Sequence, residues 1–269
     1  MIDHLINFYK TLPNLWSQAV ASLKRQWKYI VASIALVLLL FVILLIVLQL
    51  TGITEIVQAR WYYRLTGFST FTFVFCGIYL AFKNFNQDYI IFKSFKMSPY
   101  FQIILIAVLY SVIQWIVNTI IMFSTSINID NSSFGILFYA LMSILFIDVV
   151  ASILGLLSII SKNIEKIFYV IIVLTFILSP ILYIPNSNAS IWTHLMMLNP
   201  VCYLVKGSAE ANVIGLTSVS NIPYHIYFLS LVAVGYVVVY ALNRFVAHQK
   251  YNIETTTKVD TRNKANANS

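Results

Sequence analysis

One carboxylate lies inside a long apolar run, and its position needs a chemical explanation. Asp148 is the fifteenth of the 27 residues from Phe134 to Ile160, near the middle of a helix long enough to cross a membrane. A charge at that depth is costly unless it faces protein, water or a partner. It could act as a proton relay, contact a translocating substrate, or accept a structural hydrogen bond from Gln114 or Asn118. We favour the structural role, because a lone acid without an intramembrane cation is a poor relay.

Sequence signatures of the common catalytic sites are absent. The chain has no G-x-x-x-x-G-K-[ST] loop, so it does not bind and hydrolyse ATP by that route. It has neither H-E-x-x-H nor G-x-S-x-G, and its four histidines are scattered outside the cores of the apolar runs that could cross a membrane. Its two cysteines, Cys76 and Cys202, offer neither a disulfide framework nor a zinc cluster. We therefore expect no enzyme activity, no metal and no cofactor in this chain.

The apolar runs predict the elements that hold these residues. The 269 residues are 60% hydrophobic and 10% charged, which excludes an ordinary soluble domain. Continuous runs that approach the 20 or so residues of a membrane span favour helices over a β-barrel of short alternating strands. We expect an all-α integral membrane protein with six transmembrane helices, at Tyr29–Leu50, Leu65–Phe82, Ile103–Phe123, Phe134–Ile160, Ile167–Ile184 and Tyr224–Leu242.

The basic residues predict the orientation of the chain. Six spans put both termini on one side, and 14 of the 17 Lys and Arg residues then fall on that side. The positive-inside rule makes that side cytoplasmic. The net charge of +8 is therefore explained by topology, and no nucleic acid partner is expected. We expect a multi-pass protein of a bacterial plasma membrane with both termini in the cytoplasm.

Two segments flank the predicted transmembrane domain, which covers residues 29–246. Residues 1–28 carry an apolar stripe at steps of three and four, which predicts an amphipathic helix, bent or restarted at Pro13. Such a stripe suits a helix in the inner membrane interface and equally a helix packed on the bundle. Residues 247–269 are rich in Asn, Thr and Lys, which predicts a disordered cytoplasmic tail.

The connection between the fifth and sixth runs is unusual. Its apolar stretch Ile191–Leu198 is too short to cross and more plausibly dips into the membrane and returns. Asn199-Pro200 then marks a turn, and Val201–Val213 resumes as an amphipathic helix with Lys206 and Glu210 on its wetter side. We expect an extracellular re-entrant helical hairpin.

Aromatic residues cluster near the predicted span ends. The simplest interpretation is a belt that anchors the helices at the membrane interfaces. If a sugar polymer passes through the protein, rings exposed to the conduit could instead stack on it. The residues concerned are Trp61, Tyr62, Tyr63, Tyr100, Tyr183, Trp192 and Tyr224.

Three short stretches, in this order, carry a family resemblance over roughly residues 65 to 215. The first runs from Lys93 to Pro99 after the second span, the second from Ser161 to Glu165 after the fourth, and the third from Ser179-Pro180 through Tyr183 to Asn199-Pro200. In this arrangement the chain resembles the ABC-2 type membrane subunits of bacterial exporters. Within them it is most similar to polysaccharide and wall teichoic acid permeases.

The resemblance implies a half-transporter for a lipid-linked cell-surface polymer such as teichoic acid or polysaccharide. Two permease chains would form the path among the membrane lipids, and two copies of a cytoplasmic P-loop ATPase, holding ATP and Mg²⁺, would drive it. The N-terminal helix would lie near that ATPase. Candidate coupling residues are Lys93, Lys96, Pro99, Lys162 and Glu165. Candidate conduit or gate residues are Asp148, Pro180, Tyr183, Asn199 and Pro200.

Two other functions remain open from the sequence. An ABC-2 exporter of drugs, lipids or small peptides would share the fold and the ATPase but would need no surface for sugars. An ATP-independent scaffold or intramembrane enzyme would be favoured by catalytic groups converging near Asp148, which the sequence does not supply.

Overall fold

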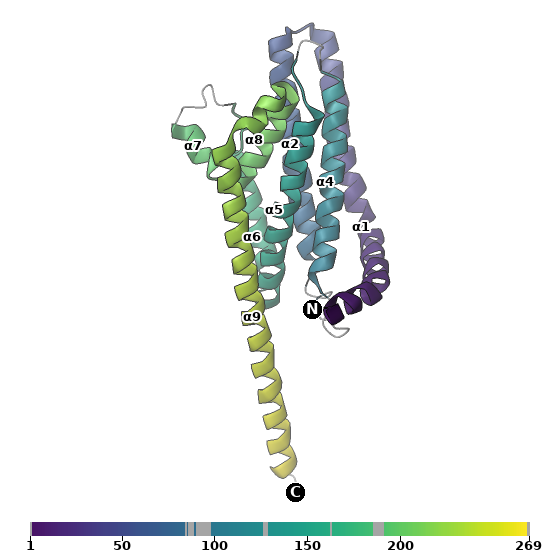
Figure 1. Ribbon diagram of the computed structural model, residues 1–269, viewed down its shortest axis with the longest axis vertical. Helices are drawn as coiled ribbons and strands as arrows, with labels where there is room; N and C mark the ends of the chain where they lie inside the picture. The colour runs from purple at the N-terminus through teal and green to yellow at the C-terminus, as the bar shows by residue number, and fades with distance from the viewer. Residues whose placement is uncertain are drawn as a thin grey trace.

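The computed structural model describes residues 2–83, 85, 89, 98–125, 129–161, 163–184 and 191–267. Within these ranges the chain is all-helical, as predicted, and the helices form an elongated bundle with both termini at one end (Figure 1). The elements are α1 (Ile2–Thr51), α2 (Glu55–Lys83), α4 (Tyr100–Phe123), α5 (Ser133–Ile160), α6 (Ile164–Ile177), α7 (Ile191–Met197), α8 (Pro200–Val213), the 3₁₀ helix η1 (Gly215–Ser220) and α9 (Ile222–Ala267).

Five helices of the described chain are long and apolar enough to cross a membrane. They contain the first, second, third, fourth and sixth of the predicted spans, so the protein is compatible with a multi-pass membrane protein. The candidate crossing segments are Ala19–Thr51, Glu55–Lys83, Tyr100–Phe123, Ser133–Ile160 and Ile222–Val246.

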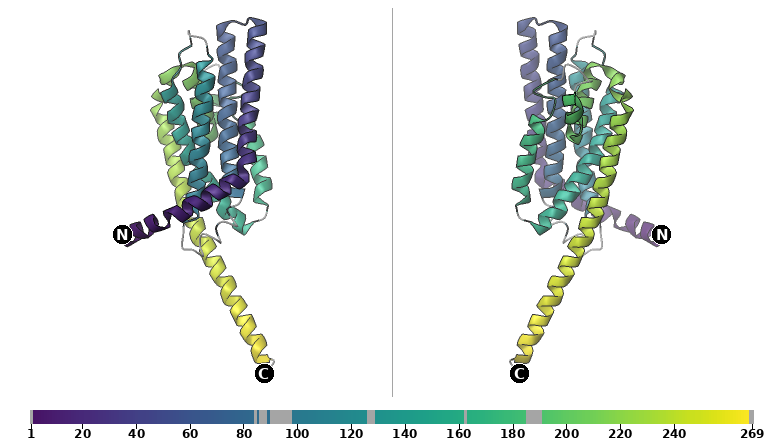
Figure 2. Two further views of the ribbon diagram at one scale, coloured as in Figure 1. Left: turned by 90° about the vertical axis from the view of Figure 1, so that its right-hand side faces the viewer. Right: turned by 90° about the vertical axis from the view of Figure 1, so that its left-hand side faces the viewer.

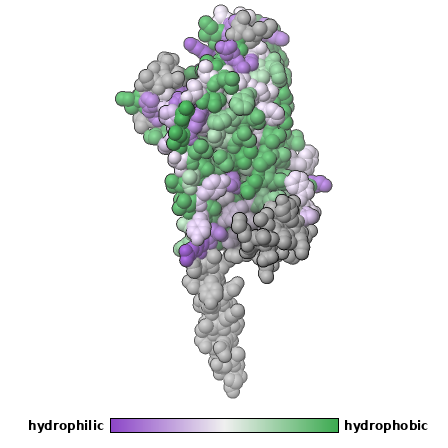
Figure 3. All heavy atoms as spheres, in the orientation of Figure 1, coloured by the Kyte–Doolittle hydropathy of each residue, from purple (hydrophilic) through white to green (hydrophobic). Residues whose placement is uncertain are grey.

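The central helix of the bundle is α2. It buries 16 of its 29 residues and packs against α1, α4, α5 and α8. The outer faces of α1 and α9 are apolar and exposed, with Leu39 at 60% and Val237 at 67% exposed. A broad hydrophobic surface covers the visible side of the bundle between more polar ends (Figure 3). In water such a surface would favour aggregation, whereas in lipid it carries no such penalty.

The fifth predicted span, Ile167–Ile184, is wrong as a single membrane-crossing helix. Helix α6 has 14 residues and ends at Ile177, so it is about 21 Å long and shorter than the hydrocarbon core of about 30 Å. Pro180 cannot donate a backbone hydrogen bond and disfavours helical geometry in the residue before it. The Ser179 hydroxyl donates to the Thr175 carbonyl oxygen (2.7 Å) at this helix end.

The N-terminal segment is continuous with the first long helix. Helix α1 runs through Pro13 without restarting, and its N-terminal part turns away from the long axis of the bundle (Figure 2). Ser22 on this part accepts a hydrogen bond from the Gln102 side chain of α4 (2.7 Å), whereas Trp16 and Trp27 of the apolar stripe are more than half exposed. Leu23 of the same stripe packs against the core, so the membrane-interface helix and the helix packed on the bundle both stay predictions.

Helix α8 begins where the sequence predicted. The Asn199 side chain accepts from the backbone N–H of Val201 (3.0 Å), and Pro200 occupies the first helical turn, where its missing N–H costs nothing. The predicted amphipathic character is wrong, because α8 buries 11 of its 14 residues, Lys206 among them. Its predicted wet side is covered by η1 and α5, which pack against it.

The tail differs from its predicted disorder. Helix α9 continues to Ala267 and projects beyond the bundle (Figures 1 and 2). Neither Gly nor Pro occurs between residues 236 and 267, so no residue with a strong preference against the helix ends it.

Candidate functional site

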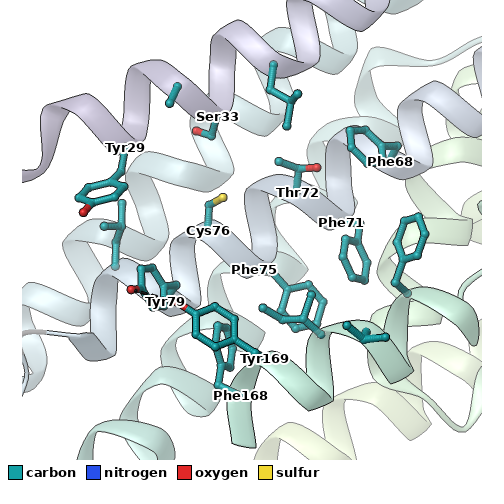
Figure 4. Close-up of a pocket in the computed structure, with 16 residues that line it drawn as sticks. Tyr29, Ser33, Phe68, Phe71, Thr72, Phe75, Cys76, Tyr79, Phe168 and Tyr169 are labelled. Atoms are coloured by element: carbon teal, nitrogen blue, oxygen red, sulfur yellow. Dashed lines mark hydrogen bonds between the residues drawn. The ribbon is translucent and has the colours of Figure 1, made fainter. Parts of the chain in front are cut away.

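A lateral groove of about 610 Å³ lies between α1, α2 and α6. Its walls are almost wholly apolar and are dominated by aromatic rings (Figure 4). The aromatic residues that line it are Tyr29, Phe68, Phe71, Phe75, Tyr79, Phe168, Tyr169 and Phe176.

The side chains of α2 divide between the two walls of the groove. Thr72 and Cys76 point toward Ser33 of α1, whereas Phe71 and Phe75 point toward α6 (Figure 4). Positions 68, 71, 75 and 79 of α2 follow a spacing of three or four residues, which places them on one helix face. This aromatic face is visible in the sequence and is the signal from which the groove could have been predicted.

Aromatic contacts attach α6 to α2. The ring centroids of Phe71 and Phe176 are 5.2 Å apart at 70°, an edge-to-face arrangement, and those of Tyr79 and Phe168 are 6.0 Å apart and stacked. Only Ile164 and Phe168 of α6 are buried. Helix α6 is therefore a lightly packed wall of the groove, with an outer face that is free to contact lipid or another chain.

One end of the groove is polar. The ammonium nitrogen of Lys83 lies 5.0 Å from the ring centroid of Tyr29 and 4.8 Å from that of Tyr79, a double cation–π contact. The Tyr79 hydroxyl donates to Oε1 of Glu165 (2.7 Å), and the Tyr169 hydroxyl donates to the Tyr79 oxygen (3.3 Å). Glu165, predicted as a coupling residue, therefore lies at this mouth of the groove.

A second polar cluster surrounds α8 near the opposite end of the bundle. Lys206 and Glu210 form an ion pair at 3.7 Å, and their side chains are only 7% and 19% exposed. Burial raises the pKa of the Glu210 carboxyl, and the nearby Lys206 ammonium partly offsets this rise. The Tyr203 hydroxyl lies 2.6 Å from Nδ1 of His225, and the Tyr139 hydroxyl donates to a backbone carbonyl of η1. The cluster ties α5, α8, η1 and α9 together.

Asp148 has a structural partner, but it is neither of the predicted ones. The Tyr236 hydroxyl of α9 donates to Oδ2 of Asp148 (2.7 Å). Gln114 and Asn118 instead donate to Ser208 (3.5 Å) and Thr70 (3.0 Å). Asp148 lies between α5 and α9 and does not line the groove, so the contacts favour the structural interpretation over a role in a conduit.

The predicted coupling residues fall in two groups. Lys93, Lys96 and Lys162 lie outside the described residues. Pro99 is the half-buried residue immediately before α4, and Glu165 is in the first turn of α6. These two positions belong to the same end of the bundle, which is also the end of the chain termini (Figure 1).

The predicted gate residues belong to one region, apart from Asp148. Pro180 is buried, Tyr183 is 57% exposed, and Asn199 with Pro200 starts α8. The two segments meet at Gly67 of α2, where an added Cβ would lie 3.6 Å from Ile181 and 3.2 Å from Val205. A side chain at Gly67 would therefore press on both.

Other chemistry is not evident in the part of the chain that the structure describes. No three His, Cys, Asp or Glu side chains come together there as a metal site would require. Comparison of the chain with protein-family models, with curated proteins and with solved structures finds no match.

Proposed function

We propose that this chain is the membrane-spanning permease subunit of an ABC exporter in a bacterial plasma membrane. Its cargo is a lipid-linked cell-surface polymer, either a teichoic acid or a polysaccharide, and a separate cytoplasmic ATPase supplies the energy. The observation that carries the proposal is the apolar, laterally open groove beside the short helix α6. A lipid-linked cargo needs an apolar surface that it can enter from the side.

The segments that carry the family resemblance coincide with structural boundaries. Ser179-Pro180 follows the end of α6, Asn199-Pro200 caps α8, and Pro99 precedes α4. These positions support the ABC-2 proposal because the resemblance rests on the order of the same segments. In the proposed transporter, the buried helix α8 and the α7 segment before it form the re-entrant hairpin near the extracellular exit.

The end of the bundle with the termini is the proposed contact surface for the ATPase. It holds the N-terminal part of α1, the end of α2 at Lys83 and the start of α6 at Glu165 (Figure 1), and the predicted topology assigns 14 of the 17 basic residues to this side. Two permease copies and two ATPase copies, with ATP and Mg²⁺ bound to the latter, make up the proposed assembly. The chain itself is a transport subunit and not an enzyme.

One observation also supports the alternative cargo of drugs, lipids or small peptides. The groove presents few polar groups beyond the hydroxyls of Ser33, Thr72 and its tyrosines. Such walls suit any amphiphile, so an ABC-2 exporter of drugs, lipids or small peptides is the alternative. The two functions differ in their cargo: the first requires a lipid that carries a sugar or polyol phosphate polymer, and the alternative requires no polymer.

The test is purification of the tagged chain in mild detergent, with identification of the chains that accompany it. We expect a stoichiometric P-loop ATPase whose turnover rises with an undecaprenyl-linked teichoic acid or polysaccharide precursor. Stimulation by small amphiphiles alone would favour the alternative cargo. A preparation that retains two permease copies but contains no ATPase would overturn both transport proposals.

A Glu165→Gln variant supplies the coupling readout, and Asp130→Asn is its matched control near the opposite end. If Glu165 takes part in coupling, its variant binds the ATPase but loses most of the substrate-stimulated turnover, while Asp130→Asn does not.

A further inference from the structure

We propose that a ring of buried polar side chains between α2, α4 and α8 binds a monovalent cation, for which Na⁺ is the probe. The inference goes beyond the proposed function and does not depend on it, since no member of the ring lines the lateral groove. The polar ring has two members from each helix: Thr66 and Thr70 of α2, Gln114 and Asn118 of α4, and Ser208 and Asn212 of α8.

Hydrogen bonds between the three helices close the polar ring. Each carboxamide donates to one hydroxyl on a neighbouring helix. The pairs are Asn118 with Thr70 (3.0 Å), Asn212 with Thr66, and Gln114 with Ser208 (3.5 Å). Within each helix the two members are four residues apart, which puts them on one face with about 5–6 Å between their Cβ atoms. The six side chains are therefore neighbours around a single three-helix contact.

Three carboxamide oxygens of the polar ring have no hydrogen-bond donor. Gln114, Asn118 and Asn212 are fully buried. Among the described residues, nothing donates to Oε1 of Gln114 or to Oδ1 of Asn118 and of Asn212. A buried acceptor is costly when it has no partner, and native proteins supply such a group with a donor or an ion. The ring therefore has more acceptors than its own side chains satisfy.

The chemistry of the polar ring selects a monovalent cation. Its oxygens all belong to uncharged carboxamides and hydroxyls. Neutral oxygens of this kind replace the hydration shell of K⁺ in channel filters and coordinate Na⁺ in transporters. Protein sites for Ca²⁺ and Mg²⁺ ordinarily include carboxylates, which the ring does not contain. An anion would need donors, whereas the unpartnered groups here are acceptors.

The charged residues of α8 do not oppose a cation in the ring. Lys206 and Glu210 lie two residues before and after Ser208, so they belong to another side of the helix. They pair with each other at 3.7 Å, and their opposite charges largely cancel at the ring. The local charge therefore permits a bound cation.

The position of the ring assigns the ion a role in holding α8. Helix α8 lies in the half of the bundle away from the termini (Figure 1). An ion in the ring joins α8 to α2 and α4 at the same time, and Asn212 is the residue before the last one of α8. The ion therefore exchanges from that end when α8 loosens, and it stabilises the folded chain because the unfolded chain has no ring.

The experiment measures binding of radioactive Na⁺ to the purified full chain in detergent, after exchange into choline chloride. We expect saturable binding of one ion per chain. We also expect the midpoint of thermal unfolding to be a few degrees higher in sodium chloride than in choline chloride of the same ionic strength. A folded chain without saturable binding overturns the proposal and leaves the ring to water.

Paired variants locate the ion. Gln114→Met removes one oxygen with little change in volume and should weaken Na⁺ binding about tenfold, as for loss of a contact with a charged group. Gln102→Met is the matched control, because Gln102 is a buried glutamine of the same helix that donates to Ser22 outside the ring, and its variant should bind Na⁺ unchanged. Equal weakening by these two variants overturns the proposal.

A third variant changes the affinity in the opposite direction. Asn118→Asp gives the ring a carboxylate, whose charge attracts the cation, so it should tighten Na⁺ binding about tenfold. Size-exclusion chromatography and the unfolding midpoint in sodium chloride identify folded preparations of each variant. A folded Asn118→Asp chain that binds Na⁺ no more tightly than the original chain contradicts the proposed site.

Discussion

At the scale of single residues, Asp148 is a buried acid whose hydrogen-bond donor is an uncharged side chain. Its Oδ2 accepts from the Tyr236 hydroxyl, and its Oδ1 has no hydrogen-bond partner among the described atoms. Each side chain therefore depends on the other, because an unpaired hydroxyl or carboxyl in an apolar interface costs free energy.

Substitution at Asp148 separates a structural role from a proton relay. We expect Asp148→Asn to keep the acceptor for Tyr236 and to preserve stability and transport. Asp148→Leu should lower the free energy of unfolding by about 1–3 kcal/mol, because the partly exposed Tyr236 hydroxyl loses its acceptor in an apolar interface. Thermal unfolding in detergent and a transport assay measure both effects.

The double variant Asp148→Leu with Tyr236→Phe should recover most of that loss. Tyr240→Phe, on an exposed part of the same helix, is the matched control and should be neutral. Loss of transport in a stably folded Asp148→Asn variant would contradict the structural role and favour a relay.

The Lys206–Glu210 pair gives the second prediction at this scale. Both side chains are largely buried, and removing one member of a buried pair leaves an uncompensated charge at a cost of about 3–5 kcal/mol. We expect Lys206→Met to destabilise the protein strongly and Lys206→Met with Glu210→Leu to restore most of the stability. Midpoints of thermal unfolding for the single and double variants test this. A double variant no more stable than the single one would show that Lys206 acts through its other contacts.

At the scale of elements, α8 depends on a close approach to α5. A Cβ at Gly207 would fall on the ring of Tyr139, closer than any side chain tolerates. We expect Gly207→Ala to displace the ring and to cost about 1–3 kcal/mol of stability. At Gly67, an added Cβ would lie 3.2 Å from Val205, a contact that small shifts relieve. Gly67→Ala is therefore the matched control with the smaller effect, and equal unfolding midpoints for the two variants would contradict this packing.

The long helices could be predicted from the sequence because each contains a continuous apolar run, which is visible without knowledge of the tertiary contacts. The Asn199-Pro200 start of α8 could also be predicted, since capping is a local interaction. The burial of Lys206 could not, because it depends on α5 and η1 closing over α8, and neither contact is encoded near residue 206. The partner of Asp148 was missed for the same reason, since Tyr236 is 88 residues away. The groove needs three helices at once, and only its aromatic face on α2 is visible in the sequence.

At the scale of the whole molecule, the chain must pass from the end of α5 to the start of α9 at the opposite end. The predicted fifth span would make this passage in one helix. Instead, α6 runs antiparallel to α2, with Phe168 near Tyr79 and Phe176 near Phe68, and stops partway. The chain reaches the other end through α7 and α8, where the Ala211 carbonyl accepts from the backbone N–H of Ser132 just before α5. The connection from α5 to α9 is therefore made by several short helices, and the groove lies beside one of them, α6.

This arrangement predicts the same topology as six complete spans and can be tested by labelling single cysteines. With Cys76 and Cys202 replaced by Ala, Asp130→Cys lies before α5 and Asn163→Cys lies just after it. Helix α5 has 28 residues and is about 42 Å long, so the two positions should face opposite sides of the membrane. We expect an impermeant maleimide to label Asp130→Cys on intact cells and Asn163→Cys only after permeabilisation. Because the predicted topology assigns 14 of the 17 basic residues to the side of Asn163, the reverse pattern would contradict the positive-inside orientation and place the Lys83 mouth of the groove outside the cell.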